Sequence, residues 1–231
     1  MAENKSTHPD SRDDLKKMGK DIGPTKDLPG MHVNETDAMP QFQEIVTNNT
    51  KNLDLNEVAF GTYCNINLYI AAPLEDVYNY AANIYSLEEW TYSLRDLKPE
   101  EGKPGLYVGT ELLAPNTKIW ASVDAYPDAK VVDYPCAWDQ GDVLWMRYYM
   151  RFVDAQATLG KPGTILMWLN CKHPFYERGH ADAPAHITES QNRKDRPWVG
   201  DFWPMFKAGH DMEAVNLKLI AEARFGYKLK K

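Results

Sequence analysis

The feature that most constrains the fold of this chain is a strand pattern that runs directly into two short helical patterns. From Gly61 to Ala71, apolar residues alternate with polar or aromatic ones, a period of two that is typical of a strand with one buried face. Pro73 follows, and Glu75 and Asp76 lie where a helix dipole favours negative charge. Apolar residues then recur at helical spacing, and Leu87 to Trp90 predicts a second short helix.

Six more segments with strand character follow, and a long helix ends the pattern. The connectors contain Pro, Gly, Asn and Asp clusters typical of short antiparallel turns, such as Lys103-Pro104-Gly105. The last helix is predicted from Trp203 to Phe225, with Asp201 as its candidate cap. We therefore expect an α+β fold with a seven-stranded antiparallel sheet. The six later strands are predicted at Leu94 to Lys98, Leu106 to Leu113, Lys118 to Tyr126, Lys130 to Ala137, Val143 to Ala155 and Gly163 to His173.

This order of elements resembles the SRPBCC superfamily, also called the START-like or helix-grip fold, which includes birch-pollen-allergen-like proteins and polyketide cyclases. The entry motif, Ala72-Pro73 with Val77-Tyr78 and Leu87 to Trp90, carries the resemblance. It implies a curved antiparallel sheet wrapped around a long C-terminal helix, with two short helices after the first strand and a ligand cavity between sheet and helix. Fold alone does not name a reaction.

Composition indicates how the chain is divided. With 231 residues, of which 43% are hydrophobic, it can bury one substantial core. We expect residues 56–231 to form the START-like ligand-binding domain and residues 1–55, which are polar and lack apolar periodicity, to form an N-terminal extension. The extension is either a flexible tail or a segment that packs across the cavity or a partner subunit. In the second case the packing residues would be Met31, Met39, Phe42, Ile45 and Val46.

Charge and cysteine content restrict the partners. A net charge of −7 and a pI near 5.4 argue against nucleic acid. No apolar run approaches the length of a membrane span, so we expect no membrane insertion and a cytoplasmic protein.

Cys64, Cys136 and Cys171 form no CxxC pair and are predicted to be free thiols. Nothing indicates a cofactor, and the strand face bearing Trp145 and Tyr149 is a candidate contact for a homo-oligomer.

Two strands are expected to line the cavity. In the strand from Val143 to Ala155, we assign the face that carries Met146, Tyr148 and Met150 to the interior. In the final strand, Ile165, Met167, Leu169 and Cys171 are assigned to the inner face, with His173 at its end near the mouth. The residues expected to contact a hydrophobic small molecule are Trp90, Trp120, Tyr134, Met146, Met150, Met167, Cys171 and Phe206.

Candidate catalytic groups lie on the last strand and the last helix. His210 and Glu213 share a helix face and form either a surface ion pair or a cavity pair with shifted pKa values. His173 is either a histidine that bonds to a backbone carbonyl at the strand end or a base. One hypothesis is an enzyme of the polyketide cyclase type, which positions an aromatic or polycarbonyl substrate for cyclisation, dehydration or decarboxylation. His173 or His210 would be the base, Glu213 would orient it, and Tyr148 or Tyr134 would donate to a developing enolate or alkoxide.

Two alternatives remain at this point. One is a non-catalytic carrier or sensor of a hydrophobic small molecule. The other is a metal-dependent hydrolase or lyase that uses the long connection from Pro174 to Gly200, where Glu177, His180 and His186 follow His173. This spacing matches no zinc motif, so the same segment is also a candidate lid over the cavity.

Overall fold

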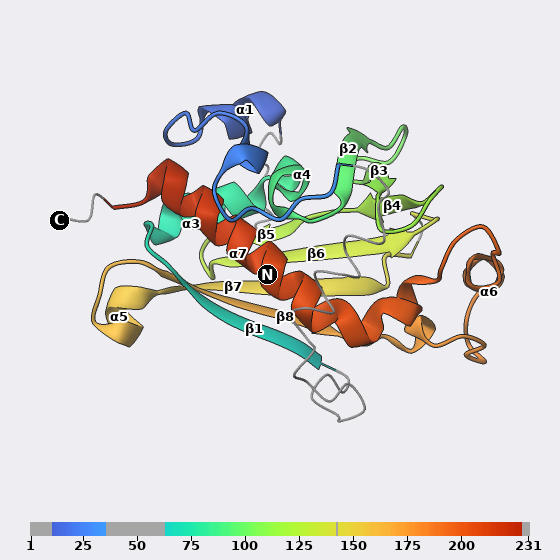
Figure 1. Ribbon diagram of the computed structural model, residues 1–231. Helices are drawn as coiled ribbons and strands as arrows, with labels where there is room; N and C mark the ends of the chain where they lie inside the picture. The colour runs from blue at the N-terminus through green and yellow to red at the C-terminus, as the bar shows by residue number, and fades with distance from the viewer. Residues whose placement is uncertain (1–10, 36–62, 142, 228–231) are drawn as a thin grey trace.

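The fold is given by a computed structural model that describes residues 11–35, 63–141 and 143–227. A curved antiparallel sheet has the strand order β1-β8-β7-β6-β4-β3-β2, and β5 pairs with β6. The long C-terminal helix α7 (Phe206–Phe225) crosses one face of this sheet (Figure 1). The arrangement is the expected α+β helix-grip fold. The strands are β1 (Tyr63–Ile70), β2 (Leu94–Pro99), β3 (Tyr107–Glu111), β4 (Lys118–Ala121), β5 (Asp124–Tyr126), β6 (Val131–Trp138), β7 (Met146–Asp154) and β8 (Thr164–Cys171).

The first strand and the helices after it form where the sequence predicts them. Pro73 precedes α3 (Leu74–Ala82), whose first turn carries two acidic residues. The side chain of Asn83 accepts a hydrogen bond from the Tyr85 amide and starts the 3-10 turn η2 (Ile84–Ser86), which leads into α4 (Leu87–Trp90). These helices lie on the same side of the sheet as α7 and close one end of the core (Figure 1).

The sheet has eight strands rather than seven because the segment predicted from Lys118 to Tyr126 is divided. Ala121 at the end of β4 pairs with Cys136, and Asp124 at the start of β5 pairs with Asp133. The two residues between them, Ser122 and Val123, lie opposite Tyr134 and Pro135. The Ser122 amide donates to the Pro135 carbonyl at 2.9 Å, but Pro135 has no N–H to donate in return. Pairing is therefore interrupted at that point.

The connection between β8 and α7 contains secondary structure of its own. It forms η3 (Pro174–Tyr176), α6 (Ala185–Gln191) and η4 (Val199–Met205). The side-chain amide of Gln191 donates to the carbonyls of Phe175 and Glu177. Tyr176, Ile187 and Trp198 are buried in the main core. A further short helix, α5 (Ala155–Leu159), joins β7 to β8.

The described part of the N-terminal extension lies against the helices. It contains α1 (Arg12–Lys17) and η1 (Thr25–Asp27), and Leu15 is only 3% exposed. The buried amide of Asn216 on α7 exchanges two hydrogen bonds with the backbone of His32. Met31 packs against the core. Residues 11–35 are thus part of the domain surface, whereas the other four residues expected to pack, and the boundary at residue 55, lie outside the described residues.

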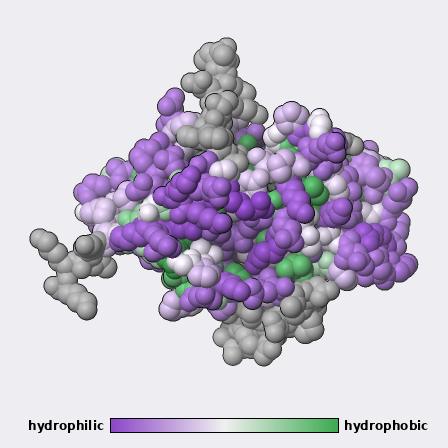
Figure 2. Space-filling model, turned by 90° about the horizontal axis from the view of Figure 1, so that it is seen from above, coloured by the Kyte–Doolittle hydropathy of each residue, from purple (hydrophilic) through white to green (hydrophobic). Residues whose placement is uncertain are grey.

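The core fills the space between the sheet and the helices. Trp90, Trp138, Trp168 and Trp198 are among the largest fully buried side chains. The face seen in Figure 2 is covered mainly by hydrophilic residues, and hydrophobic residues form only small separate patches on it. In the part of the chain that the structure describes, none of the helices combines the length and the apolar character of a transmembrane segment.

Candidate functional site

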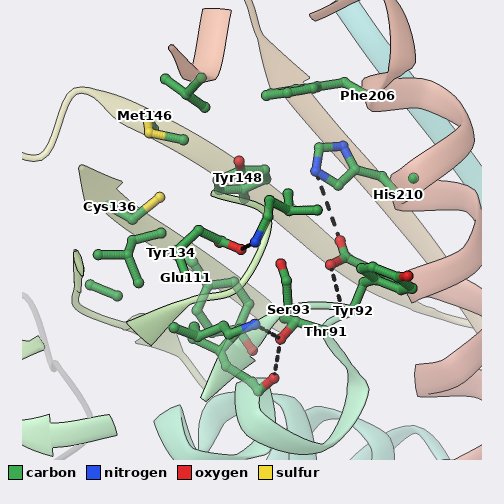
Figure 3. Close-up of a pocket in the computed structure, with 18 of the residues that line it drawn as sticks. Thr91, Tyr92, Ser93, Glu111, Tyr134, Cys136, Met146, Tyr148, Phe206 and His210 are labelled. Atoms are coloured by element: carbon green, nitrogen blue, oxygen red, sulfur yellow. Dashed lines mark hydrogen bonds and ion pairs between the residues drawn. The ribbon is translucent and has the colours of Figure 1, made fainter. Parts of the chain in front are cut away.

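An apolar cavity of about 110 Å³ lies between the sheet and the N-terminal half of α7. Phe206 and His210 project from α7 toward the strands that carry Met146 and Tyr148 (Figure 3). The remaining wall comes from α4, the residues that follow it, and η4. The lining residues are Leu87, Trp90, Thr91, Tyr92, Ser93, Leu94, Glu111, Leu113, Ile119, Ala121, Tyr134, Cys136, Trp138, Met146, Tyr148, Trp168, Val199, Phe202, Phe206, Gly209, His210 and Glu213.

The structure places some of the expected ligand-contact residues in this lining and others elsewhere. Trp90, Tyr134, Met146 and Phe206 line the cavity. Met150 faces inward and is fully buried, but it lies outside the lining. The assignment of Trp120 is wrong, because its neighbours Ile119 and Ala121 occupy the inner face of β4 and Trp120 therefore lies on the other face.

The predicted inner face of the final strand is also wrong. Trp168 pairs with Met150 and Leu166 pairs with Phe152, and cross-strand partners share a face of the sheet. The buried face of β8 therefore carries Thr164, Leu166, Trp168 and Asn170. Met167 is 45% exposed and Cys171 is half-buried on the opposite face. The run from Ile165 to Leu169 is apolar throughout, so alternation alone could not choose between the two faces.

His173 lies away from the cavity lining. Its Nδ1 accepts a hydrogen bond from the amide of Phe175 at 3.1 Å and caps η3. Its ring packs against Trp145 and Phe175, with ring centroids 5.6 and 4.5 Å away. Burial lowers the pKa of His173, and His180 lowers it further. His173 is therefore bonded to the backbone at the strand end, through an amide rather than the expected carbonyl, and this placement gives no support to its role as the cavity base.

The candidate metal ligands do not converge. Glu177 forms an ion pair with Lys172 at 3.1 Å, and His180 Nδ1 accepts from the backbone amide of Asp182 at 3.3 Å. His186 lies in the first turn of α6. Among the described residues, which include all of these, no three His, Cys, Asp or Glu side chains are grouped as a metal site would require.

His210 and Glu213 both face the cavity from α7. Glu213 accepts a hydrogen bond from the Tyr92 amide at 2.8 Å, and its other oxygen lies 3.8 Å from His210 Nε2 (Figure 3). The His210 ring packs between Trp168 and Phe206, with centroid distances of 4.9 and 5.1 Å. The arrangement is the buried alternative for this pair rather than a surface ion pair.

Burial shifts the two pKa values in opposite directions. It raises the pKa of Glu213 to about 8, and nearby Glu111 adds to this rise. It lowers the pKa of His210 to about 3, and the charge of Lys207 adds to this fall. At pH 7 the cavity therefore holds a protonated carboxyl group beside a neutral imidazole, because a low-dielectric site disfavours either charge. Such divergent shifts identify an acid and a base in many active sites.

A second buried carboxyl group, which sequence reasoning missed, also lines the cavity. Glu111 at the end of β3 accepts hydrogen bonds from the Leu113 amide at 3.0 Å and from the Ser93 side chain. Burial raises its pKa. The signal available in the sequence was its position in a predicted strand, two residues after Gly109, on what proves to be the buried face. An acidic residue at such a position is unusual unless it has a partner or a function.

The two candidate tyrosine donors differ in what their hydroxyl groups do. The Tyr134 hydroxyl donates to the Ala81 carbonyl, so it is already engaged with the backbone. Tyr148 lies beside His210, with ring centroids 5.3 Å apart, and its hydroxyl is hydrogen bonded with Tyr176. Burial raises the pKa of Tyr148 well above its usual value. Tyr148 therefore keeps its proton at neutral pH.

The shifted pKa values predict how stability depends on pH. Between pH 4.5 and 8 the folded state keeps the Glu213 proton that the unfolded state releases, so this group lowers the free energy of unfolding as pH rises. For His210, the unfolded state binds a proton between pH 3 and 6.5 that the folded state does not bind. The free energy of unfolding therefore rises with pH over this interval. The two effects cancel between pH 4.5 and 6.5, and only the Glu213 effect remains above this window.

Denaturant unfolding of the wild type and Glu213→Gln at pH 6.5 and pH 8 measures this effect. We expect the wild type to lose about 2 kcal/mol relative to the variant over this interval, at about 1.4 kcal/mol per pH unit. His210→Gln serves as the comparison, because it should retain the loss above pH 6.5 and lack the rise between pH 3 and 4.5. Parallel curves for the wild type and Glu213→Gln would show that Glu213 is ionised in the folded protein.

No protein-family model and no curated protein sequence matches the chain. Among solved structures, the Aha1 dimer from Colwellia psychrerythraea matches with a TM-score of 0.44 and 12% identity, over 71% of this chain and 96% of that chain. A START superfamily protein from Mycobacterium smegmatis matches with a TM-score of 0.40 and 14% identity, over 71% and 97%. DynU16, a protein in the dynemicin biosynthetic locus, matches with a TM-score of 0.42 and 11% identity, over 71% and 50%. At these values, the function has to be argued from the residues of this chain.

Proposed function

We propose that the protein is an enzyme that binds a small apolar carbonyl compound in the cavity and catalyses its enolisation. Enolisation is the step from which a cyclisation, a dehydration or a decarboxylation of such a compound can proceed. The observation that carries the proposal is the neutral pair of Glu213 and His210 in one apolar cavity. A carboxyl group that keeps its proton can act as an acid at the pH where an adjacent neutral imidazole can act as a base.

In the proposed step, two protons move and the cavity keeps zero net charge. Glu213 donates its proton to the carbonyl oxygen of the substrate, while His210 accepts a proton from the adjacent carbon. The products are an enol, a carboxylate and an imidazolium. The last two lie 3.8 Å apart in the structure, so each new charge forms beside its opposite. Because burial disfavours an isolated charge, this pairing lowers the barrier more here than it would in water.

Other residues of the site have supporting roles in this proposal. The Tyr92 amide holds the Glu213 carboxyl group and stabilises the carboxylate that forms when the proton leaves. Tyr148 packs against His210 and helps to hold the imidazole, and its un-ionised hydroxyl group is already hydrogen bonded with Tyr176. The Trp168 and Phe206 rings hold the imidazole in place.

The volume of the cavity bounds the substrate. At about 110 Å³ it is close to an engineered 150 Å³ protein cavity that binds benzene, and well below the roughly 300–1,000 Å³ of sites for drug-sized molecules. We therefore propose a compound of about one ring in size, which is narrower than the aromatic or polycarbonyl substrate expected from the sequence.

A non-catalytic carrier is the second candidate, and the polar groups weigh against it. A carrier of a hydrophobic molecule needs an apolar cavity but has no use for Glu111, His210 and Glu213 in its wall. Burying such groups costs free energy that a purely apolar lining would avoid. The apolar residues of the cavity wall are compatible with an enzyme and with a carrier alike.

Native mass spectrometry of the wild type and of the double variant His210→Gln/Glu213→Gln tests the proposal. We expect the double variant to retain a ring-sized carbonyl compound after purification, because the cavity is preserved and the proton-transfer groups are absent. Incubating that compound with the wild type should convert it to a product of different structure. Quantitative recovery of the compound unchanged would make the protein a carrier.

A further inference from the structure

A second and larger cleft lies between the N-terminal segment and the helices. Its volume is about 520 Å³, which falls in the range of sites for small organic ligands. The segment that contains α1 and η1 forms one wall, and α4, the start of β2 and the end of α7 form the other (Figure 1). It shares no lining residue with the apolar cavity.

Most charges that line the cleft are neutralised by a partner. Lys26 pairs with Glu35 at 2.6 Å, and Arg224 holds Glu89 through two hydrogen bonds of 2.8 Å. The remaining glutamate in the lining, Glu88, is held in the same way by Arg12, again with two contacts of 2.8 Å.

Among the described residues, the cationic side chains of the cleft lining that form no ion pair outnumber the carboxylates that form none. Lys16, Lys20 and Arg95 line the cleft and form no ion pair with a described residue. Asp21 is the remaining carboxylate, and it accepts a hydrogen bond from the Gly23 amide at 3.0 Å. The cleft therefore carries a surplus of positive charge on a chain whose net charge is −7. A local field of this sign concentrates anions.

Arg95 is held in place by the backbone. Its guanidinium group donates to the carbonyls of Thr91 at 3.1 Å, Tyr92 at 3.0 Å and Leu94 at 2.6 Å. These acceptors carry no net charge, so they fix the guanidinium without forming an ion pair, while Glu88 and Glu35 of the cleft lining act on it only electrostatically. A guanidinium fixed in advance loses little side-chain entropy when it binds a carboxylate or a phosphate group.

We propose that this cleft is a binding site for a small organic anion, with Arg95 at its base and Lys16 and Lys20 at its rim. The ligand is recognised through an oxyanion group, either a phosphate or a carboxylate. The inference does not depend on the reaction proposed for the cavity. It adds a second ligand to the protein.

The two sites share one stretch of backbone. Thr91, Tyr92 and Leu94, whose carbonyls hold Arg95, also line the apolar cavity, and the Tyr92 amide binds Glu213. An anion bound to Arg95 would therefore perturb the backbone segment whose Tyr92 amide positions Glu213 in the cavity. This gives the cleft a route by which its occupancy could influence the cavity.

Isothermal titration calorimetry of the full chain at low ionic strength tests the proposal, with pyrophosphate and citrate as separate probes. We expect at least one to bind saturably, and more weakly as salt is added. Binding of pyrophosphate alone would identify a phosphate ligand, and binding of citrate alone a carboxylate. If neither probe binds at about 10 mM, where even a weak complex is populated, the proposal is wrong.

Three variants and a matched control locate the binding. Arg95→Gln should weaken it by at least about tenfold, because hydrogen bonds to charged groups are each worth about 1.5–3 kcal/mol. Lys16→Gln and Lys20→Gln should each weaken it by about two- to fivefold. Lys17→Gln makes the same change on the same short helix outside the cleft lining and should leave affinity unchanged.

The lysine variants also decide the result if Arg95→Gln does not fold, since both are at exposed positions. Equal losses for Lys16→Gln, Lys20→Gln and Lys17→Gln would mean that anions bind only to general surface charge, and this would overturn the proposal. So would an affinity that none of the variants changes.

Discussion

Glu213→Gln is expected to lower turnover by about 10²- to 10⁴-fold, the range associated with one positioned acid or base, while leaving the fold intact at neutral pH. Glutamine has the shape of a protonated glutamic acid and is likewise neutral, so it should keep the hydrogen bond from the Tyr92 amide. What it lacks is the transferable proton. The substrate recovered with the double variant provides the assay, and Glu189→Gln, at an exposed position on α6, is the matched control that should retain full activity.

The pH profile distinguishes a lost acid from a disturbed cavity. The reactive form needs a protonated Glu213 and a neutral His210, so wild-type activity should fall above a pH of about 8 and below a pH of about 3. In Glu213→Gln the alkaline limb should disappear from the residual activity, since the group that titrates there is gone. A variant that keeps both its turnover and its alkaline limb would remove Glu213 from the mechanism.

The parts of the fold that the sequence predicts are those specified by local chemistry. Alternation in β1, Pro73 at the start of α3 and Gly226 after α7 each act within a few residues, and the ends that they set, at Ile70, Leu74 and Phe225, agree with the structure to within a residue. The predicted start of the last helix is wrong, because α7 begins at Phe206 rather than Trp203 and Asp201 accepts a hydrogen bond from the Trp198 amide in η4 instead of capping α7. The strand split near Ala121 depends instead on Pro135 in a neighbouring strand. The residue pattern within one segment does not show which residues of another strand lie opposite it.

The candidate site could likewise be predicted from the sequence only where local residue spacing specifies it. The spacing of His210 and Glu213 places them on one helix face, but only the packed structure shows that this face is buried against Trp168. Glu111 lines the cavity because it lies on the buried face at the end of β3, and Asn216 is buried because the distant backbone of His32 supplies hydrogen-bond partners. His173 was assigned to the cavity through the face of β8, and that error followed from a run of apolar residues without alternation.

The connection between β8 and α7 covers one side of the cavity with Val199 and Phe202 of η4. This cover is held to the sheet by a buried ion pair, which provides the second large effect. Arg196 has no exposed side-chain surface and pairs with Asp139, just after β6. The same carboxylate accepts a hydrogen bond from Ser190 on α6 and lies 3.6 Å from Arg193. Two guanidinium nitrogens of Arg196, Nε and one Nη, have no hydrogen-bond partner among the described residues. The Asp139 carboxylate is therefore the main compensation for a fully buried charge.

Asp139→Asn is expected to lower the free energy of unfolding by about 3–5 kcal/mol, because removing one partner of a buried pair leaves the other charge uncompensated. Asparagine tolerates the left-handed backbone of this position, where φ is 64°, so the loss would come from charge and not from strain. Asp195→Asn is the matched control, because it removes a carboxylate from Arg193, which also lies 3.6 Å from Asp139, and leaves the partner of Arg196 in place. Both side chains of the Asp195–Arg193 pair are about a third or more exposed, so we expect a loss of less than about 1 kcal/mol.

Denaturant unfolding at neutral pH compares the two variants. The chain from Arg196 leads directly into η4, which contributes Val199 and Phe202 to the cavity wall. Releasing the pair should therefore also speed exchange of the cavity ligand, which the control should not do. If the two variants lose equal stability, Arg196 is sufficiently stabilised by its position 5.1 Å from the Trp138 ring and by the Ser190 hydroxyl, and the pair does not hold the cover in place.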